Sequence, residues 1–303
     1  MKRGIWLGIV GLALVALVVL VAVSGNKTPT FSGRRALTHA RQLMRLGPRI
    51  PGSQASVEAQ GYIADQLRRE GWEVETQRFA YGGVALANVI AKRGEGPIVI
   101  VGTHYDTRPM ADRDPVDRTA PVPGANDGTS GTAVLLELAR VLDPAATEGM
   151  QVWLAFFDAE DSGDVANWEW AVGSRYMAQR LVNEPGNRPE YVIIIDMIGI
   201  ADQKIHYEWS SSLWLQEKLW ALAAELGYED MFVPLYKYHV IADHTPFLQT
   251  GLEAALLINM DDPNWHTQRD TLDKLSAQSL QRVGRLLQVW LEEEPLATRA
   301  VSR

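Results

Sequence analysis

The chain has 303 residues, of which 47 % are hydrophobic, and it carries a formal net charge of -8. This length allows one large domain or two small ones, and the acidic residues leave no basic stripe of the kind that binds a phosphate backbone, so we do not expect nucleic acid as a partner. The chain contains no cysteine, which excludes disulfides, thiolate metal sites and a cysteine nucleophile. Only His, Asp and Glu are left to hold a metal ion.

The N-terminal segment, residues 1–25, predicts a membrane anchor. Its stretch from Ile5 to Val23 contains no charged residue and follows two basic residues. As a helix this stretch would be about 28 Å long, close to the ~30 Å hydrocarbon core of a bilayer, and the basic flank favours an N-terminus inside the cell. The alternative is a cleaved signal peptide, because Ala22 and Ser24 resemble a small-residue cleavage site. In both cases we expect the domain after the tether, residues 26–33, to lie outside the cytoplasm.

Past the tether, segments with helical periodicity alternate with short apolar runs of the kind that form buried parallel strands. This alternation predicts an α/β sandwich with a mixed, mostly parallel central sheet and a hairpin at its edge, built as one domain over residues 34–295 and followed by a tail, 296–303. We expect helices at 34–45, 57–69 (with Ser53 as N-cap), 131–141, 173–182, 213–226 and 277–291, and strands at 72–81, 84–92, 97–103, 150–157, 191–196 and 254–258.

Residues that carry chemistry follow the predicted parallel strands. In open α/β folds ligands bind outside the carboxyl ends of the strands, so these side chains are expected to converge if the strands are neighbours. They are His104 and Asp106 after the strand at 97–103, Asp158, Glu160 and Asp161 after 150–157, Asp196 at the end of 191–196, Trp265 and His266 after 254–258, and Asp127 where the helix after GAND opens.

Histidine plus carboxylates, without thiolates, is a ligand set of catalytic zinc. Two carboxylates 4 to 5 Å apart repel by about 3 to 4 kcal/mol, and a divalent cation turns this repulsion into attraction. Glu160 and Asp161 are adjacent and point in different directions, so one can bind the metal while the other handles a proton. Asp106 is close enough to His104 in the chain to orient a metal-bound imidazole ring.

Each of these residues, taken singly, also has a structural interpretation. Asp127 would be explained as a helix N-cap, Asp196 as a turn residue at a strand end, and His266 as a surface histidine. A run such as DAED is most often a solvated loop. These interpretations do not account for the placement of all the candidates at predicted strand ends, and we therefore predict a metal site at this edge of the sheet.

The sequence resembles metallopeptidase family twenty-eight, which contains zinc aminopeptidases and animal-type glutaminyl cyclases. The resemblance extends from about Arg34 to Leu291 and rests on GPRIPGS, GTHYDT, PGANDGTSG, FFDAED, GSRYMA, DMIG, DHTPF and WHTQRDTLDKL, in family order. It implies a three-layer α/β/α fold with Glu160 as the proton-handling carboxylate. It also implies five zinc ligands, namely His104, Asp127, Asp161, Asp196 and His266.

The resemblance leaves the number of ions open. Asp127 would bridge two ions, whereas the cyclases hold one ion through the positions of Asp127, Asp161 and His266. Asp161 stands where the family more commonly has Glu. This side chain is shorter but still permits ligation.

Both reactions of the family act on a peptide N-terminus. The aminopeptidases hydrolyse the first peptide bond, and the cyclases convert an N-terminal Gln to pyroglutamate with release of ammonia. Trp265 and the Trp-bearing segment around Trp168 resemble the cyclases, and together with Asp243 they are the expected substrate-pocket residues. Against a working cyclase stand Ala242 and Leu256, at positions where cyclases carry an Asp and a His.

We therefore expect a membrane-anchored zinc enzyme that acts on the N-terminus of peptides or proteins, with cyclisation preferred over aminopeptidase hydrolysis. A secreted form is the alternative if the N-terminal segment is cleaved. A degenerate binding ectodomain is a further hypothesis. The full set of candidate ligands together with Glu160 argues against it.

Overall fold

The computed structural model describes residues 29–293. The predicted membrane anchor (1–25), the first three residues of the tether (26–28) and the tail (296–303) lie outside the described residues. Between residues 29 and 293, no helix is both long enough and apolar enough to cross a membrane.

Helices and strands alternate along the described chain, as the hydrophobic pattern predicts. The helices are α2 (Gly33–Met44), α3 (Gln54–Arg69), α4 (Thr129–Val141), α5 (Val172–Asn183), α6 (Leu213–Glu225), α7 (His244–Gln249) and α8 (Ala277–Glu293), with short 3-10 turns at Pro185–Asn187 and Leu272–Lys274. The strands are β1 (Glu73–Tyr81), β2 (Val84–Gly94), β3 (Ile98–His104), β4 (Gln151–Phe157), β5 (Tyr191–Asp196), β6 (Ile205–Glu208), β7 (Phe232–Tyr238) and β8 (Ala254–Ile258).

A six-stranded sheet forms the centre of the molecule, with the strand order β1-β2-β4-β3-β5-β8. Strands β4, β3, β5 and β8 run parallel, while the β1–β2 hairpin lies at one edge and pairs antiparallel with β4. The predicted mixed, mostly parallel sheet with an edge hairpin is therefore confirmed. The order also makes the four parallel strands neighbours, so their carboxyl ends lie at the same edge of the sheet.

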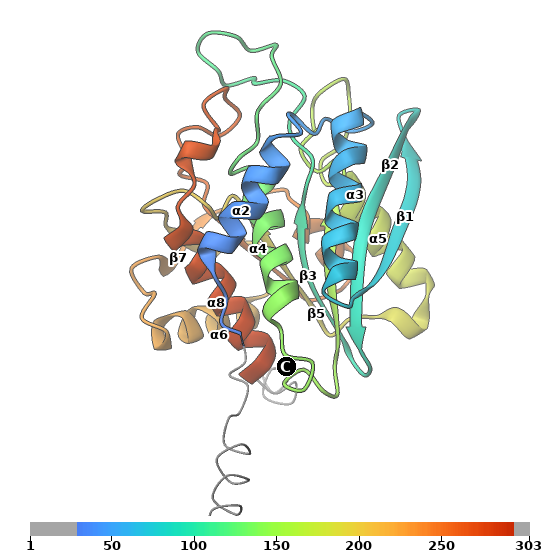
Figure 1. Ribbon diagram of the computed structural model, residues 1–303, viewed down its shortest axis with the longest axis vertical. Coiled ribbons are helices and arrows are strands. Elements are labelled where there is room, and N and C mark those ends of the chain that lie inside the picture. Colours follow the sequence, from blue (N-terminus) through green and yellow to red (C-terminus); the bar gives the residue numbers. More distant parts are fainter. Residues whose placement is uncertain (1–28, 294–303) are drawn as a thin grey trace, which may run out of the picture.

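Helices cover both faces of this sheet and complete a three-layer α/β/α sandwich (Figure 1). One layer contains α2, α3, α4, α6 and α8, and the other contains α5 and α7. Alternate residues of β3 face the two layers: Val99 and Val101 belong to the first core, and Ile98 and Ile100 to the second. Burial on both faces explains why this strand is an uninterrupted apolar run.

Of the two residues interpreted as helix N-caps, Ser53 caps its helix and Asp127 does not. The Ser53 side chain accepts a hydrogen bond from the backbone N–H of Ser56, as expected of an N-cap. The cap of α4 is Gly128, with a φ of 91°. Asp127 therefore precedes the cap and is not the N-cap residue, which removes its structural interpretation.

A second sheet of two parallel strands, β6 and β7, and the short helix α7 were not predicted. Strand β7 reads FVPLYKY, and most of its residues are exposed. The strand contains a proline and lacks the buried alternation by which strands are recognised, so its conformation depends on pairing with β6.

Candidate metal centre

Two groups of side chains meet at the carboxyl ends of β3, β4, β5 and β8. One group is His104, Asp127 and Asp196, and the other is Asp127, Asp161 and His266. Within each group, one possible ligand atom per residue lies within 4.8 Å of the others. Asp127 belongs to both groups, so the five candidate ligands form one continuous cluster.

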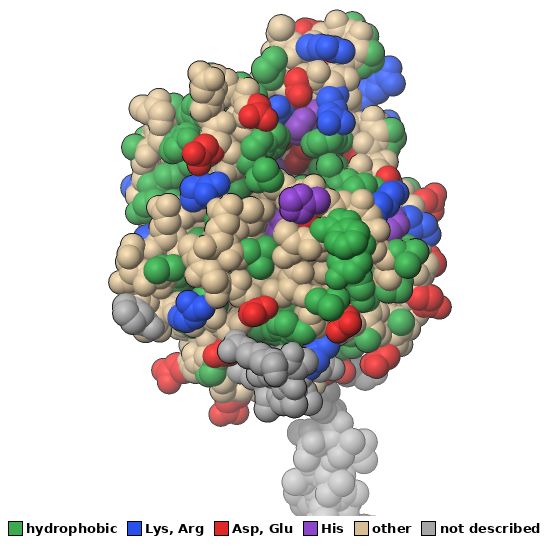
Figure 2. Space-filling view, turned by 180° about the vertical axis from the view of Figure 1, so that it is seen from behind, with side chains coloured by type: hydrophobic (Ala, Val, Ile, Leu, Met, Phe, Trp, Pro, Cys, Tyr) green, Lys and Arg blue, Asp and Glu red, His purple; other side chains and the backbone are tan. Residues whose placement is uncertain are grey.

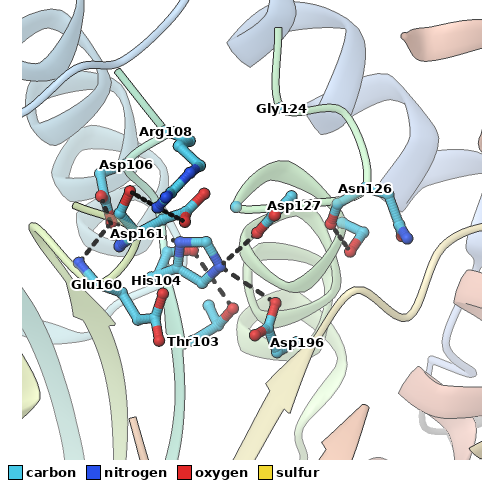
Figure 3. Close-up of polar contacts among 12 residues, drawn as sticks. Thr103, His104, Asp106, Arg108, Gly124, Asn126, Asp127, Glu160, Asp161 and Asp196 are labelled. Atoms are coloured by element: carbon cyan, nitrogen blue, oxygen red, sulfur yellow. Dashed lines mark hydrogen bonds and ion pairs between the residues drawn. The ribbon is translucent and has the colours of Figure 1, made fainter. Parts of the chain in front are cut away.

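The Asp127 carboxylate lies between two histidines. His104 Nε2 is 3.2 Å from Asp127 Oδ1 and 3.1 Å from Asp196 Oδ1. Dashed lines mark these two contacts in Figure 3. His266 Nε2 is 3.9 Å from Asp127 Oδ2 and 3.2 Å from Asp161 Oδ1. Each carboxylate oxygen of Asp127 thus faces a different imidazole, an arrangement that can bridge two cations or serve one.

The backbone is strained at the turns that carry these residues. Ala159, Met197 and His266 have φ values of 55°, 49° and 58°. Such left-handed conformations of non-glycine residues cost on the order of 1 to 3 kcal/mol each and collect at functional sites. The site residues at these turns are all near the carboxyl side of the sheet: Asp196 ends β5, Glu160 lies in the loop after β4, and His266 lies in the loop between β8 and α8.

Burial dominates the electrostatics of the cluster. Burial, followed by repulsion from Asp127, holds the pKa of Asp161 well above its ordinary value, and burial also raises the pKa of Glu160. Burial alone would lower the pKa of His104, but the neighbouring carboxylates, Asp196 first, outweigh it and raise this pKa. Without a cation, the cluster therefore retains protons that separate carboxylic acids would release.

The donor set fits a divalent cation of the zinc type. Burial lowers the pKa of His266 to about 4, so its imidazole is neutral and has a free lone pair at neutral pH. Oδ2 of Asp127 and Oδ2 of Asp161 are buried and accept no hydrogen bond from the described residues. Buried carboxylate oxygens without donors are costly unless a cation binds them, and His with carboxylates is a zinc ligand set.

Two further carboxylates hold the cluster in place. Asp106 accepts hydrogen bonds from the backbone N–H groups of Glu160 (3.1 Å) and Asp161 (3.2 Å), and its Oδ1 lies 3.4 Å from His104 Nδ1. The expected proximity of Asp106 to the His104 ring is thus present. Asp270 accepts from the N–H of Asp127 at 3.1 Å and so fixes the backbone of the shared ligand position. The sequence indicated no such role for Asp270.

Arg108 is a site residue that the sequence analysis missed. Charged residues are frequent between Arg108 and Arg118, a composition typical of a solvated loop, but Arg108 is only 4 % exposed. Its Nη1 lies 3.3 Å from Asp161 Oδ1, and its Nε donates to Asp112 Oδ1 at 2.6 Å. Asp112 Oδ1 in turn lies 3.1 Å from His266 Nδ1. The only signal in the sequence was the position of Arg108 directly after the GTHYDT motif.

A cavity of about 310 Å³ opens above the cluster and has mostly apolar walls. Figure 2 shows this hollowed face of the molecule. Glu160 lies in the cavity beside Asp127, Asp161, Asp196 and His266. The remaining walls are Trp170, Met197, His239, Val240, Ile241, Ala242, Ile258, Met260 and Trp265.

The two expected pocket tryptophans have different positions. Trp265 lines the cavity, and its ring centroid is 4.2 Å from that of His266. Trp168 does not line the cavity; it packs edge-on against Tyr81 of the hairpin, at 5.2 Å. Trp170, two residues later, lies in the cavity and stacks on His266 at 6.2 Å with an interplanar angle of 7°. Sequence proximity alone did not distinguish Trp168 from Trp170.

Asp243, the third expected pocket residue, lies beneath the cavity wall. It is 1 % exposed, and burial raises its pKa to about 7. Its neighbour His244 contacts the buried Glu208, with Nε2 3.2 Å from Oε2. Glu208 also accepts from the N–H of Val240 through Oε1 at 3.2 Å, so this pair ties down the loop that forms the wall. No motif in the sequence points to this role of Glu208.

Comparison with known proteins leads to the same family that the sequence motifs resemble. Residues 88–291 match the model of Peptidase family M28. Aminopeptidase YwaD of Bacillus subtilis is 25 % identical over 91 % of this chain and 60 % of its own length, so the chain spans less than two thirds of that relative.

Solved structures agree in fold. A Zn-dependent exopeptidase from Parabacteroides distasonis has a TM-score of 0.82 and 28 % identity, covering 88 % of this chain and 100 % of that one. A glutaminyl cyclase from Tannerella forsythia has a TM-score of 0.81 and 29 % identity, with the same coverage of 88 % and 100 %. The family model covers more than half of the chain, and the chain therefore belongs to peptidase family M28, as its motifs predicted.

Proposed function

We propose that this protein is a zinc-dependent enzyme that acts on the N-terminus of peptides, and that its reaction is the cyclisation of N-terminal Gln. The observation that carries the proposal is the cavity itself. Glu160 stands in it beside Asp127, Asp161 and His266, and the indole rings of Trp170 and Trp265 form part of its walls. The likeness to a glutaminyl cyclase of Tannerella forsythia supports the same reaction.

In this proposal Asp127, Asp161 and His266 hold one zinc ion, which polarises the γ-carboxamide of the substrate when bound. The α-amine nitrogen attacks the γ-carboxamide carbon, so a C–N bond forms and the bond to the leaving nitrogen breaks. Glu160 takes a proton from the attacking amine and passes it to the departing ammonia. The apolar walls exclude water, which would otherwise compete as a nucleophile.

Two apolar residues argue against the cyclase reaction, because they stand at the positions where cyclases carry an Asp and a His. Leu256 is 0 % exposed and packs in the core between the sheet and α7, and Ala242 is 2 % exposed. Neither side chain can donate a hydrogen bond to a reacting amide. If the reaction is cyclisation, the orientation of the amide depends on other groups, of which Asp196 lines the cavity.

Aminopeptidase hydrolysis is the second candidate, and the second ligand group favours it. His104 and Asp196, together with Asp127, would hold a second ion. Two ions at a shared carboxylate can serve both the attacking water and the leaving amine of a hydrolysis. Glu160 would then take the proton from water. The similarity to aminopeptidase YwaD also supports this candidate.

The test is mass spectrometry of the zinc-loaded full-length chain with two peptides that differ only in the first residue, Gln or Leu. Loss of ammonia from the Gln peptide, with the Leu peptide intact, is the expected result. Release of free Leu would show that the reaction is aminopeptidase hydrolysis and not cyclisation. No reaction with either peptide would overturn the enzymatic proposal and favour a binding ectodomain.

We propose in addition that residues 5–23 anchor the enzyme in a membrane with the catalytic domain on the extracytoplasmic side. The support is the uncharged stretch after a basic start. Extraction of membranes with alkaline carbonate tests the anchor, because a spanning helix stays in the pellet. Recovery of the protein in the supernatant, with a mature N-terminus near Gly25, would indicate a cleaved signal.

A further inference from the structure

Exposed apolar side chains are concentrated next to the cavity. The described residues include eight large hydrophobic side chains that are exposed, and five of them fall between residues 209 and 241: Trp209, Leu213, Leu235, Tyr236 and Ile241. Figure 2 shows hydrophobic side chains gathered beside the hollow, on the side of β7. Such concentration on one surface of a protein marks an interaction site more often than single exposed residues do.

Trp209 and Tyr236 form the flat centre of this surface, which we name the aromatic platform. Their rings stack with centroids 4.3 Å apart and an interplanar angle of 18°, although Trp209 is 61 % exposed and Tyr236 39 % exposed. Tyr207 packs edge-on against Tyr236 at 5.4 Å and against Trp220 of the core at 5.1 Å. The platform is therefore held rigidly from below while its outer surface stays open to solvent.

The platform is continuous with the cavity wall. The backbone N–H of Trp209 donates to the carbonyl of Tyr238 at 2.9 Å, and the next residues, His239 to Ile241, line the cavity. Ile241 is both a wall residue and 57 % exposed. His239 follows Tyr236 by three positions in the chain, which in extended conformation is about 10 Å. A peptide whose first residue is in the cavity would reach the platform with its third to fifth residues.

Charge fixes the direction in which a peptide enters. Glu160 and Asp196, the two cavity carboxylates that do not hold the single zinc ion of the proposed reaction, attract an α-ammonium group, so the N-terminus points inward and the rest of the chain leaves through the mouth. The cation of Arg113 stacks on the cavity residue Trp265 at 3.8 Å. On the platform side, Lys237 is paired with Asp261 at 2.6 Å, which leaves the aromatic surface without net charge.

We infer that the aromatic platform binds an apolar or aromatic side chain at the third to fifth position of the substrate peptide and so selects peptides with such a residue there. This inference rests on the proposed action on peptide N-termini and deepens it, because it names a substrate class. Stacking on two rings at a surface is expected to improve binding of such a peptide by about fivefold to tenfold.

The experiment separates binding from reaction. Binding is measured by calorimetry with the zinc-loaded full-length Glu160→Gln protein, and turnover with the wild-type protein. The ligands are two peptides with the same first two residues and Phe or Ser at positions three to five, and an amide of the first residue alone. Trp209→Ala and Tyr236→Ala are compared with Val57→Ala, a control at a side chain that is 53 % exposed on α3.

The expected result is tighter binding of the Phe peptide than of the Ser peptide. This preference should disappear in both platform variants and persist in Val57→Ala, while binding of the short amide stays unchanged throughout. Equal affinities for the two peptides, or a preference that survives both platform variants, would overturn the inference. Binding of lipid vesicles that is lost in Trp209→Ala, with unchanged peptide affinity, would also overturn it in favour of a membrane contact. If the wild-type protein turns over neither peptide but the Phe peptide still binds more tightly than the Ser peptide, the proposed reaction is wrong and the inference about the aromatic platform stands.

Discussion

Arg108 holds both the side chain and the backbone of Asp161. Its Nη1 lies 3.3 Å from Asp161 Oδ1, 3.4 Å from the Asp161 carbonyl oxygen and 3.3 Å from that of Gly163. The guanidinium donates to Oδ1 of Asp161, whereas Oδ2 of Asp161 accepts no hydrogen bond from the described residues. Asp161 is one methylene shorter than the Glu more common at this position. Arg108 fixes its carboxylate where it can reach the shared cluster.

Replacement of Arg108 by Met is expected to lower zinc affinity or activity by about 10- to 100-fold, as is typical when a residue that orients a ligand is removed. Lys should not rescue the loss, because one ammonium group does not reproduce the planar fork that spans Asp112 and Asp161. Competition with a zinc chelator measures the affinity, with Arg118→Met as a control in the same loop. Wild-type affinity in Arg108→Lys would mean that only the charge matters.

The Glu160→Gln substitution should reduce turnover by about 10² to 10⁴-fold while zinc content is retained. Glu160 lines the cavity but belongs to neither group of candidate ligands, so its loss removes a proton carrier and not a metal ligand. Turnover and metal analysis on the same sample measure the two effects. The exposed Glu169→Gln is the matched control. Unchanged turnover in Glu160→Gln would remove the assigned role.

Metal stoichiometry tests whether the cluster holds one ion or two. With the cyclase proposal we expect about one zinc per chain, lost in His266→Ala and retained in His104→Ala, because the single ion uses Asp127, Asp161 and His266. Elemental analysis after dialysis measures the content. Two ions in the wild type, with one lost in His104→Ala, would favour the aminopeptidase reaction.

Substitution of Trp170 is expected to affect substrate binding, and substitution of Trp168 is expected to affect stability. Trp170→Ala should raise KM by about tenfold, because it opens a wall of the cavity and removes the ring stacked on His266. Trp168→Ala should leave KM unchanged and lower the free energy of unfolding by about 2 kcal/mol, because this ring does not line the cavity and packs in the small cluster with Tyr81 and Val172. Steady-state kinetics and urea unfolding of both variants check the assignment. An equal rise in KM for both would contradict it.

Glu208 should stabilise the fold in a pH-dependent way. Burial alone would raise its pKa, but hydrogen bonds from His244 and Ser210 outweigh this and lower the pKa to about 2. The unfolded-state value is about 4.5. The stabilisation is therefore fully present above about pH 4.5 and is lost as the pH falls towards 2.

Glu208→Gln should cost about 3 kcal/mol of unfolding free energy near neutral pH, because Gln places an amide donor among groups that already donate. The difference in unfolding free energy between Glu208→Gln and the wild type should be smaller at about pH 3.5 than near neutral pH. Urea unfolding at the two pH values measures it, with the exposed Glu217→Gln as control. A difference that does not change with pH would show that the carboxylate charge contributes nothing.

The sequence by itself determined the central sheet and the composition of the site. Residues buried on both faces of β3, β5 and β8 must all be apolar, so these strands are visible as uninterrupted runs, and helical periodicity between them is equally local. His104 and Asp196 end such strands, Glu160 and Asp161 follow one closely, and Asp127 precedes a helix, so their convergence needed only the assumption that the parallel strands are neighbours. Strand order confirmed that assumption.

The tertiary structure alone decided which side chains touch. Asp127 lies between two histidines that are far apart in sequence, Trp170 rather than Trp168 faces the cavity, and Arg108 is buried against Asp161. The physical reason is that periodicity reports burial along one element, whereas these contacts depend on loops from different strands. Left-handed turns such as that at His266 and paired strands such as β6 and β7 are stabilised by long-range contacts, and these leave no local pattern to read.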